Sequence, residues 1–204
     1  MRPVERFSGL GRLYHRTRPS YPPALVNFLR QQAPGLDACD VGAGTGIFTS
    51  LLVQSGFCVT AVEPNASMRQ AGQWCPGVNV VNGSAEYTTC APCSFDLVVA
   101  AQAFHWFDVD AAVTEMHRIG RRGGLCAALW NDRTDDAGGD AHGFNAEVNA
   151  LLREYSPDYR AVRKIDETLH ELAKRVANGY LVEYKNSQDL RSRADAIDNF
   201  WSRS

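Results

Sequence analysis

The chain has 204 residues, of which 45% are hydrophobic and 22% charged, and its formal net charge is −2. These values are typical of a globular protein with one substantial core, and no run of like charges predicts binding to nucleic acid. No segment reaches the roughly 18 consecutive apolar residues of a membrane helix, and the amino terminus lacks the apolar core of a secretion signal. We therefore expect a cytoplasmic protein with reduced cysteines and no membrane or nucleic-acid partner.

The predicted elements alternate between helix and strand. Pro22 and Pro23 suit the first turn of a helix that ends before Pro34. Strands are then predicted at 36–41, 57–63, 78–82, 95–102 and 123–130, and helices at 46–56, 65–74 and 109–120. This alternation predicts an α/β fold, a Rossmann-like, doubly wound and mostly parallel sheet with helices on both faces.

Unusual residues follow the first two strands, at the sheet edge where ligands bind in this fold class. Asp40 precedes Gly42, Gly44 and Gly46, and glycines at such a turn let a ligand approach the backbone closely. Glu63 ends the second strand, where a carboxylate can accept hydrogen bonds from both hydroxyls of a ribose. Together these features predict a ligand that contains a nucleoside.

The glycine spacing argues against a dinucleotide. In G-x-G-x-x-G the pyrophosphate lies on the helix N-terminus, whereas here the third glycine comes one residue early and Ile47 takes its place. Asp40 would oppose a pyrophosphate, but it favours a cationic group, directly or through water, such as the ammonium of a methionine moiety. A Walker loop is excluded because no Gly-Lys-Ser/Thr follows.

These residues resemble a known family. The segments DVGAGTG (40–46), VEPN (62–65), GSAE (83–86) and FDLVVAAQAFHWFD (95–108) are similar to motifs of the class I S-adenosylmethionine-dependent methyltransferases, in particular the small-molecule branch that includes trans-aconitate methyltransferases. The resemblance covers about residues 7–133. It implies S-adenosylmethionine as cofactor, S-adenosylhomocysteine as product, a small-molecule methyl acceptor with a carboxylate as one option, and a monomer or homodimer.

The resemblance also implies roles for individual residues. Glu63 would bind the ribose diol, Met68 would cover an adenine face, and the segment 84–86 would contact the adenine edge. For Arg18, which lies in a segment similar to the family's lid, capping of the following helix stays an alternative. The predicted cofactor-binding residues are Tyr14, Arg18, Asp40, Gly42, Ala43, Gly44, Gly46, Glu63, Pro64, Asn65, Met68, Ser84, Ala85, Glu86, Gln102 and Ala103.

Candidates for the acceptor side follow the fourth and fifth strands. Methyl transfer depends mainly on positioning, and only a hydroxyl or amine acceptor must lose a proton. His105 is the candidate catalytic base, with orientation of its loop as the alternative. Trp106 and Phe107 would line the acceptor pocket or fill the core. Asn131 and Arg133 would bind acceptor polar groups, or instead form a helix cap and a solvated loop.

Metal chemistry is not expected. Cys90 and Cys93 form a CxxC motif, but no second pair supplies further zinc ligands, and we interpret the motif as an incidental loop pair. The histidines show no metal-ligand spacing.

We expect a single methyltransferase domain over 1–204, with an N-terminal lid and helix (1–34), a cofactor-binding core (35–133) and a helical, substrate-side region (134–204). Class I methyltransferases usually end with two antiparallel strands, but only 179–186 predicts a further strand here, so the last one is missing from the pattern. Two explanations stay open: a truncated version of a longer enzyme, or a sheet that closes in another way.

Three functions remain to be separated. The first is a methyltransferase, and the second is a catalytically deficient, cofactor-binding protein that acts through a partner. The third, a nicotinamide enzyme, predicts that NAD binds better than S-adenosylhomocysteine.

Overall fold

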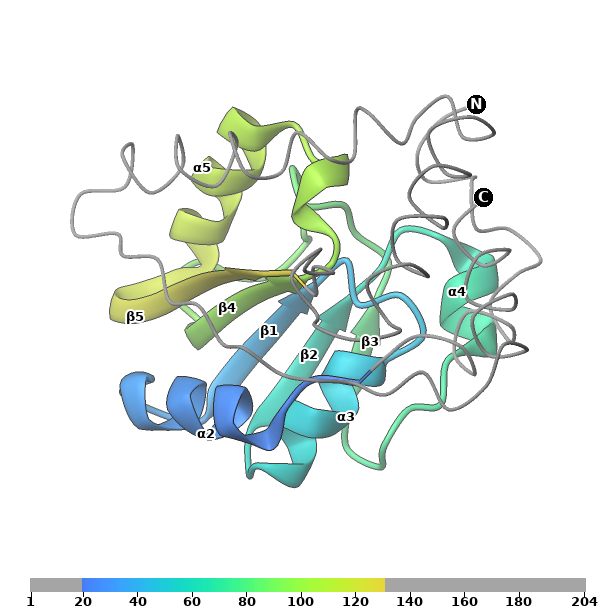
Figure 1. Ribbon diagram of the computed structural model, residues 1–204. Helices are drawn as coiled ribbons and strands as arrows, with labels where there is room; N and C mark the ends of the chain where they lie inside the picture. Colours follow the sequence, from blue (N-terminus) through green and yellow to red (C-terminus); the bar gives the residue numbers. More distant parts are fainter. Residues whose placement is uncertain (1–19, 131–204) are drawn as a thin grey trace, which may run out of the picture. The chain divides into compact units, whose positions relative to one another are not determined.

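The computed structural model describes residues 20–130, which form a five-stranded parallel sheet in the order β3-β2-β1-β4-β5 (Figure 1). The strands are β1 (Asp37–Val41), β2 (Cys58–Val62), β3 (Asn79–Val81), β4 (Phe95–Ala101) and β5 (Gly120–Leu129). All four strand pairings are parallel. The predicted Rossmann-like α/β class is therefore confirmed, with one strand at each of the five positions predicted within residues 20–130.

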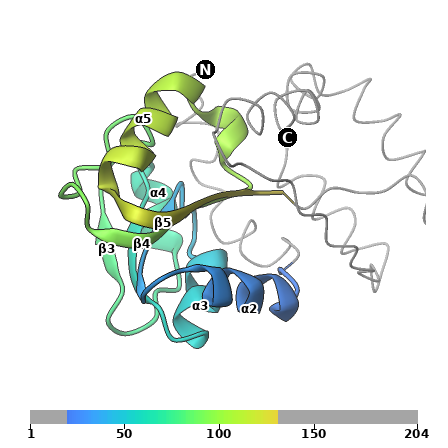
Figure 2. The same ribbon diagram turned by 90° about the vertical axis from the view of Figure 1, so that its left-hand side faces the viewer.

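Helices cover both faces of this sheet. They are α2 (Pro23–Gln32), α3 (Ile47–Gln54), α4 (Ala66–Ala71) and α5 (Val109–Ile119), with a short 3₁₀ helix η2 (Phe104–Trp106). Figures 1 and 2 show α2 and α3 on one face and α5 on the other. Because both faces are covered, β4 is buried almost from end to end, as its continuous apolar sequence predicts.

The core on the α2 and α3 face is apolar. Val26 and Leu29 of α2 pack with Phe48 and Leu52 of α3 against the sheet. On the other face, α5 buries Ala112, Glu115, Met116 and Ile119. The helical periodicity predicts Val113 on this buried face, but Val113 is only partly buried, and the carboxylate of Glu115 lies inside instead.

Two boundaries differ from the prediction. Helix α4 ends at Ala71 rather than near 74, since Gly72 is extended and takes the chain out of the helix. Strand β5 begins at Gly120 rather than 123, and its register against β4 shifts between Phe95 and Leu97. Gly123, at φ 79°, provides the left-handed conformation that this irregularity requires.

The predicted lid, the strand at 179–186 with its flanking helices, and the question of the last antiparallel strand lie outside the described residues. Those described belong to one compact unit, and the single domain over 1–204 stays a prediction. Within 20–130, no helix has the length and apolar character needed to cross a membrane.

Candidate functional site

The loop between β1 and α3 requires glycine at three positions. Gly42, Gly44 and Gly46 all have left-handed backbone, with φ of 74°, 59° and 83°. A Cβ on Gly42 would lie 2.6 Å from the Cβ of Ala103 and 3.2 Å from the ring of Phe107. The loop is therefore packed directly against the turn that follows β4.

The same loop is also tied to the end of β2. The backbone N–H groups of Gly42 and Ala43 both donate to the carbonyl oxygen of Val62, at 2.8 and 3.0 Å. Three strand ends thus meet at this edge of the sheet, as the sequence predicts. The glycine loop is the common element that contacts the other two.

Asp40 lies in β1 and is fully buried. Its Oδ2 accepts a 2.6 Å hydrogen bond from the hydroxyl of Thr49 on α3, whereas no donor among the described residues reaches the buried Oδ1. Burial raises the pKa of Asp40 to about 7, with Thr49 lowering it and Glu63 raising it. Leaving a buried acceptor without a donor is unfavourable, so a bound cation or donor would be stabilising here.

Glu63 follows β2 and is 7% exposed. Its Oε2 accepts from the N–H of Gly44 at 2.9 Å, and its Oε1 from the N–H of Asn65 at 2.8 Å. Burial raises the pKa of Glu63, and these two N–H groups oppose the shift. Since each carboxylate oxygen has two lone pairs, each retains the capacity to accept from a ligand hydroxyl.

The segment that follows Glu63, which includes α4, lies beside the glycine loop at the carboxyl edge of the sheet. The side chain of Asn65 caps α4 by accepting from two backbone N–H groups of its first turn, and Met68 is 3% exposed. The sequence did not single out Trp74, whose ring lies against Gly46 and Gly72; a Cβ on Gly46 would lie 2.8 Å from it. An aromatic residue just beyond Gly72 was the available signal for this contact.

The turn after β3 holds the predicted adenine-edge residues. The N–H of Ser84 donates to the carbonyl of Tyr87 at 3.0 Å, and the N–H of Tyr87 donates to Ser84 Oγ at 3.2 Å. Ala85 is buried. Glu86 is turned toward a neighbouring loop, where its Oε1 accepts from the N–H of Asp108 at 3.0 Å. Glu86 thus links this turn to the start of α5.

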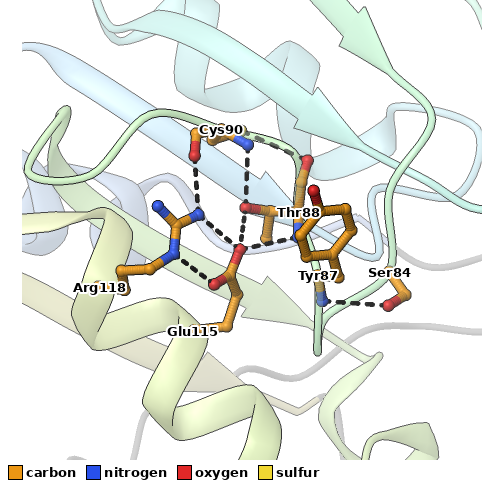
Figure 3. Close-up of polar contacts among 6 residues, drawn as sticks. All are labelled: Ser84, Tyr87, Thr88, Cys90, Glu115 and Arg118. Carbon is orange, nitrogen blue, oxygen red and sulfur yellow. Dashed lines mark hydrogen bonds and ion pairs between the residues drawn. The ribbon is translucent and has the colours of Figure 1, made fainter.

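A cluster of Thr88, Cys90, Glu115 and Arg118, here called the Glu115 cluster, anchors the same turn to α5 (Figure 3). Glu115 Oε1 accepts from the N–H and hydroxyl of Thr88, at 2.8 and 2.6 Å. The Arg118 guanidinium donates to both carboxylate oxygens, at 2.6 and 2.8 Å, and to the carbonyl of Cys90 at 2.7 Å. Arg118, with Thr88, lowers the pKa of Glu115 to about 2.

The CxxC motif does not act as a pair in this structure. A hydrogen bond with Cys39 of β1 lowers the pKa of the Cys90 thiol to about 7, while Cys93 is exposed. All six cysteines are free thiols. Across residues 20–130, no three His, Cys, Asp or Glu side chains gather in a way that could hold a metal ion.

The turn after β4 carries the acceptor-side candidates. Gln102 has left-handed backbone at φ 54°, unusual for a residue with a side chain, and its N–H donates to the carbonyl of Leu129 at 2.8 Å. Ala103 is buried against Gly42. His105 and Trp106 lie in η2 with ring centroids 4.7 Å apart. The remaining predicted site residues lie outside the described part of the chain: Tyr14, Arg18, Asn131 and Arg133.

Comparison with known proteins gives consistent matches. Residues 39–128 match the family model described as a methyltransferase domain. An uncharacterized methyltransferase of Mycobacterium tuberculosis is 38% identical over 126 residues, which are 61% of this chain and 51% of that protein. The chain therefore spans about half the length of this curated relative.

Two solved structures that resemble this chain are also candidate methyltransferases. A candidate type II methyltransferase from Anaeromyxobacter dehalogenans has a TM-score of 0.61 and 34% identity, covering 70% of this chain and 61% of that one. A candidate S-adenosylmethionine-dependent methyltransferase from Methanococcus maripaludis, at 18% identity and a TM-score of 0.52, covers 78% of both chains and shares the fold. The comparisons do not distinguish the trans-aconitate branch.

Proposed function

Since residues 39–128 match the model of the methyltransferase domain family, we propose that this chain belongs to that family, binds S-adenosylmethionine at the carboxyl edge of its sheet and transfers the methyl group to a small molecule. One observation carries the proposal. Asp40, the glycine loop and Glu63 lie together at that edge, with an unsatisfied acidic oxygen on one side and a carboxylate with spare acceptor capacity on the other.

Asp40 and Glu63 suit two different parts of the cofactor, its methionine moiety and its ribose. Asp40 Oδ1 offers a negative acceptor for the α-ammonium of the methionine moiety, and Glu63 offers acceptors for the ribose hydroxyls. Met68 and Ala85 would contact the adenine, with Pro64 beside Glu63 completing the wall. Gln102 and Ala103 would lie under the sulfur.

When bound, the cofactor supplies an activated methyl group on a sulfonium, so the chain mainly has to position the acceptor and exclude water. Trp106 and Phe107 would form the apolar wall that does this. His105 would take the proton from a hydroxyl or amine acceptor and would have no such role with a carboxylate. Tyr14, Arg18, Asn131 and Arg133 would complete the site, and we propose that the protein works in the cytoplasm as a monomer or homodimer.

Isothermal titration tests the shared premise. Wild-type protein is expected to bind S-adenosylmethionine and S-adenosylhomocysteine and to bind NAD more weakly. Glu63→Gln replaces one acceptor oxygen with an amide and should weaken S-adenosylhomocysteine binding about tenfold or more. Asp110→Asn, a carboxylate change at an exposed position on α5, is the matched control and should bind normally. Absence of binding to both cofactor forms would refute the proposal, as would a preference for NAD.

Turnover is tested separately with tritiated methyl groups. The labelled cofactor is incubated with sets of small carboxylates, amines and phenols, and labelled product is measured. Transfer to any of them supports an enzyme, whereas binding without transfer across the three sets supports the catalytically deficient alternative. With an amine or phenol acceptor, His105→Gln should slow transfer, and with a carboxylate it should not.

A further inference from the structure

We propose that Thr49 is a positioning residue that holds the Asp40 carboxylate so that Oδ1 is presented to the α-ammonium of the cofactor. This inference rests on the proposed function. Thr49 comes from α3, outside the glycine loop, and nothing in the sequence pattern of the loop indicated it.

The first support is the geometry of the hydrogen bond. Thr49 lies in the first turn of α3, is 1% exposed, and donates its hydroxyl to Asp40 Oδ2 at 2.6 Å. This is the short length expected of a hydroxyl bonded to a charged oxygen. A β-branched side chain in a helix also has few rotamers, so the donor is fixed before any ligand binds.

The second support is the difference between the two Asp40 oxygens. Oδ2 is satisfied by Thr49, while Oδ1 is equally buried and receives no hydrogen bond from the described residues. Because the carboxylate cannot rotate without breaking the Thr49 bond, the unsatisfied oxygen keeps one direction. Such preorganisation lowers the cost of ligand binding.

The charged surroundings of Asp40 make a cation the favoured ligand. Glu63 at the end of β2 interacts unfavourably with Asp40, and Cys39 is its titratable neighbour in β1. Helix α3 carries no titratable side chain along Ile47–Gln54. With burial and Glu63 both opposing ionisation, the Thr49 hydroxyl is the largest stabilising contact of the anion, and the backbone of Thr49 adds a smaller one.

Two ligands separate a positioning role from a general structural one. S-adenosylhomocysteine carries the α-ammonium, whereas 5′-methylthioadenosine keeps the adenosine and the sulfur and lacks the amino-acid part. Thr49→Val removes the hydroxyl at nearly constant volume, and Thr49→Ser keeps it. Dissociation constants for both ligands are measured by titration calorimetry with the full chain, and Thr49→Ala replaces the valine variant if that one does not fold.

The expected result is selective. At pH 8, Thr49→Val should weaken S-adenosylhomocysteine binding about tenfold, Thr49→Ser should stay within about twofold of wild type, and 5′-methylthioadenosine should bind all variants alike. Binding of S-adenosylhomocysteine should also weaken as the pH falls through the pKa of Asp40, near 7 in the wild type, and this fall should begin at higher pH in Thr49→Val.

Three results would overturn the inference: equal weakening of both ligands by Thr49→Val, unchanged S-adenosylhomocysteine binding in that variant, or a serine variant as weak as the valine one. Failure of the proposed function looks different. In that case the wild-type protein itself binds neither ligand, whatever residue stands at 49.

Discussion

Two buried carboxylates, Asp40 and Glu115, lie on opposite faces of the same sheet and have opposite environments. Glu115 receives donors on both oxygens, from Thr88 and Arg118, and its pKa falls to about 2. Asp40 receives the Thr49 hydroxyl on one oxygen only, and burial raises its pKa to about 7. The first carboxylate is satisfied by the fold, and the second is not.

This difference in hydrogen bonding suggests a different role for each carboxylate, one structural and one in ligand binding. A fully paired buried charge fixes local structure, and in the Glu115 cluster it holds the turn after β3 on α5. A buried charge with an unsatisfied oxygen destabilises the fold, and such groups gather at functional sites, where a ligand supplies the missing partner. We therefore interpret the Glu115 cluster as structural, and we propose that the ligand binds at the sheet edge formed by Asp40, the glycine loop and Glu63, here called the Asp40 edge.

The largest change in the free energy of unfolding is expected from Glu115→Ala. It leaves the N–H and hydroxyl of Thr88 without their acceptor and Arg118 without its partner, so the free energy of unfolding should fall by about 4 kcal/mol. Urea unfolding at pH 7 measures this. His117→Gln, at an exposed position of the same helix, should change little. A loss below about 1 kcal/mol would contradict a structural role for the cluster.

At the Asp40 edge, close packing rather than ion pairing holds the geometry, and Gly42→Ala tests it. The new Cβ would lie 2.6 Å from Ala103 in a left-handed conformation, and we expect a loss of about 3 kcal/mol. Gly77→Ala is the matched control, because Gly77 has a similar φ of 86° with nothing within 4 Å, so only about 1 kcal/mol should be lost. Equal losses in urea unfolding would show that the contact with Ala103 does not matter.

Within residues 20–130, most of the fold and the glycine loop could be predicted from sequence, because both depend on local patterns. Alternating apolar runs located all five strands, and glycines ahead of a helix located the turn with positive φ. The carboxylates at 40 and 63 were located because the ends of parallel strands share one edge. Each of these inferences needed only sequence order and strand direction.

The contacts that distinguish Asp40 from Glu115 could not be predicted in this way. Glu115 occupies a position of α5 that its polarity assigns to solvent, and it is buried only because Thr88 and Arg118 pair with it. Thr49 and Trp74 likewise act through side-chain contacts with residues outside their own element. Such contacts depend on the packing of helices on the sheet, which periodicity does not specify.

In contrast to the substitutions above, Asp40→Asn is expected to raise the free energy of unfolding. At pH 8 the buried anion costs roughly 4 kcal/mol, since its pKa is about three units above the ordinary value. The asparagine amide must still find an acceptor, so a net gain in unfolding free energy of about 2 kcal/mol is expected. Binding of S-adenosylhomocysteine should weaken in the same variant. A gain in stability with unchanged S-adenosylhomocysteine binding would contradict a ligand role for Asp40.

The pH dependence of that variant follows from the direction of the shift. A raised pKa means that the folded state binds the Asp40 proton more tightly, so the destabilising contribution of Asp40 to the wild-type fold decreases as the pH falls from about 7 to about 4. Asp40→Asn does not titrate, and its advantage should disappear over this range. Unfolding of both proteins at pH 8 and pH 4.5 measures the change, and a constant advantage would show that Asp40 does not carry the raised pKa.

The smallest effect is expected from Arg118→Lys, because the guanidinium is partly exposed and lysine keeps the charge. Lysine cannot donate to both Glu115 oxygens and the Cys90 carbonyl in one plane, so the pKa of Glu115 should rise toward its ordinary value of 4.5. A lowered pKa stabilises the fold above about pH 4.5, and that contribution is lost as the pH falls toward 2. The difference between wild type and variant should therefore be full at pH 7 and absent near pH 2. The contribution of Asp40 to the free energy of unfolding has the opposite pH dependence. If the loss of stability in Arg118→Lys instead grew as the pH fell, the two carboxylates would not differ as the structure indicates.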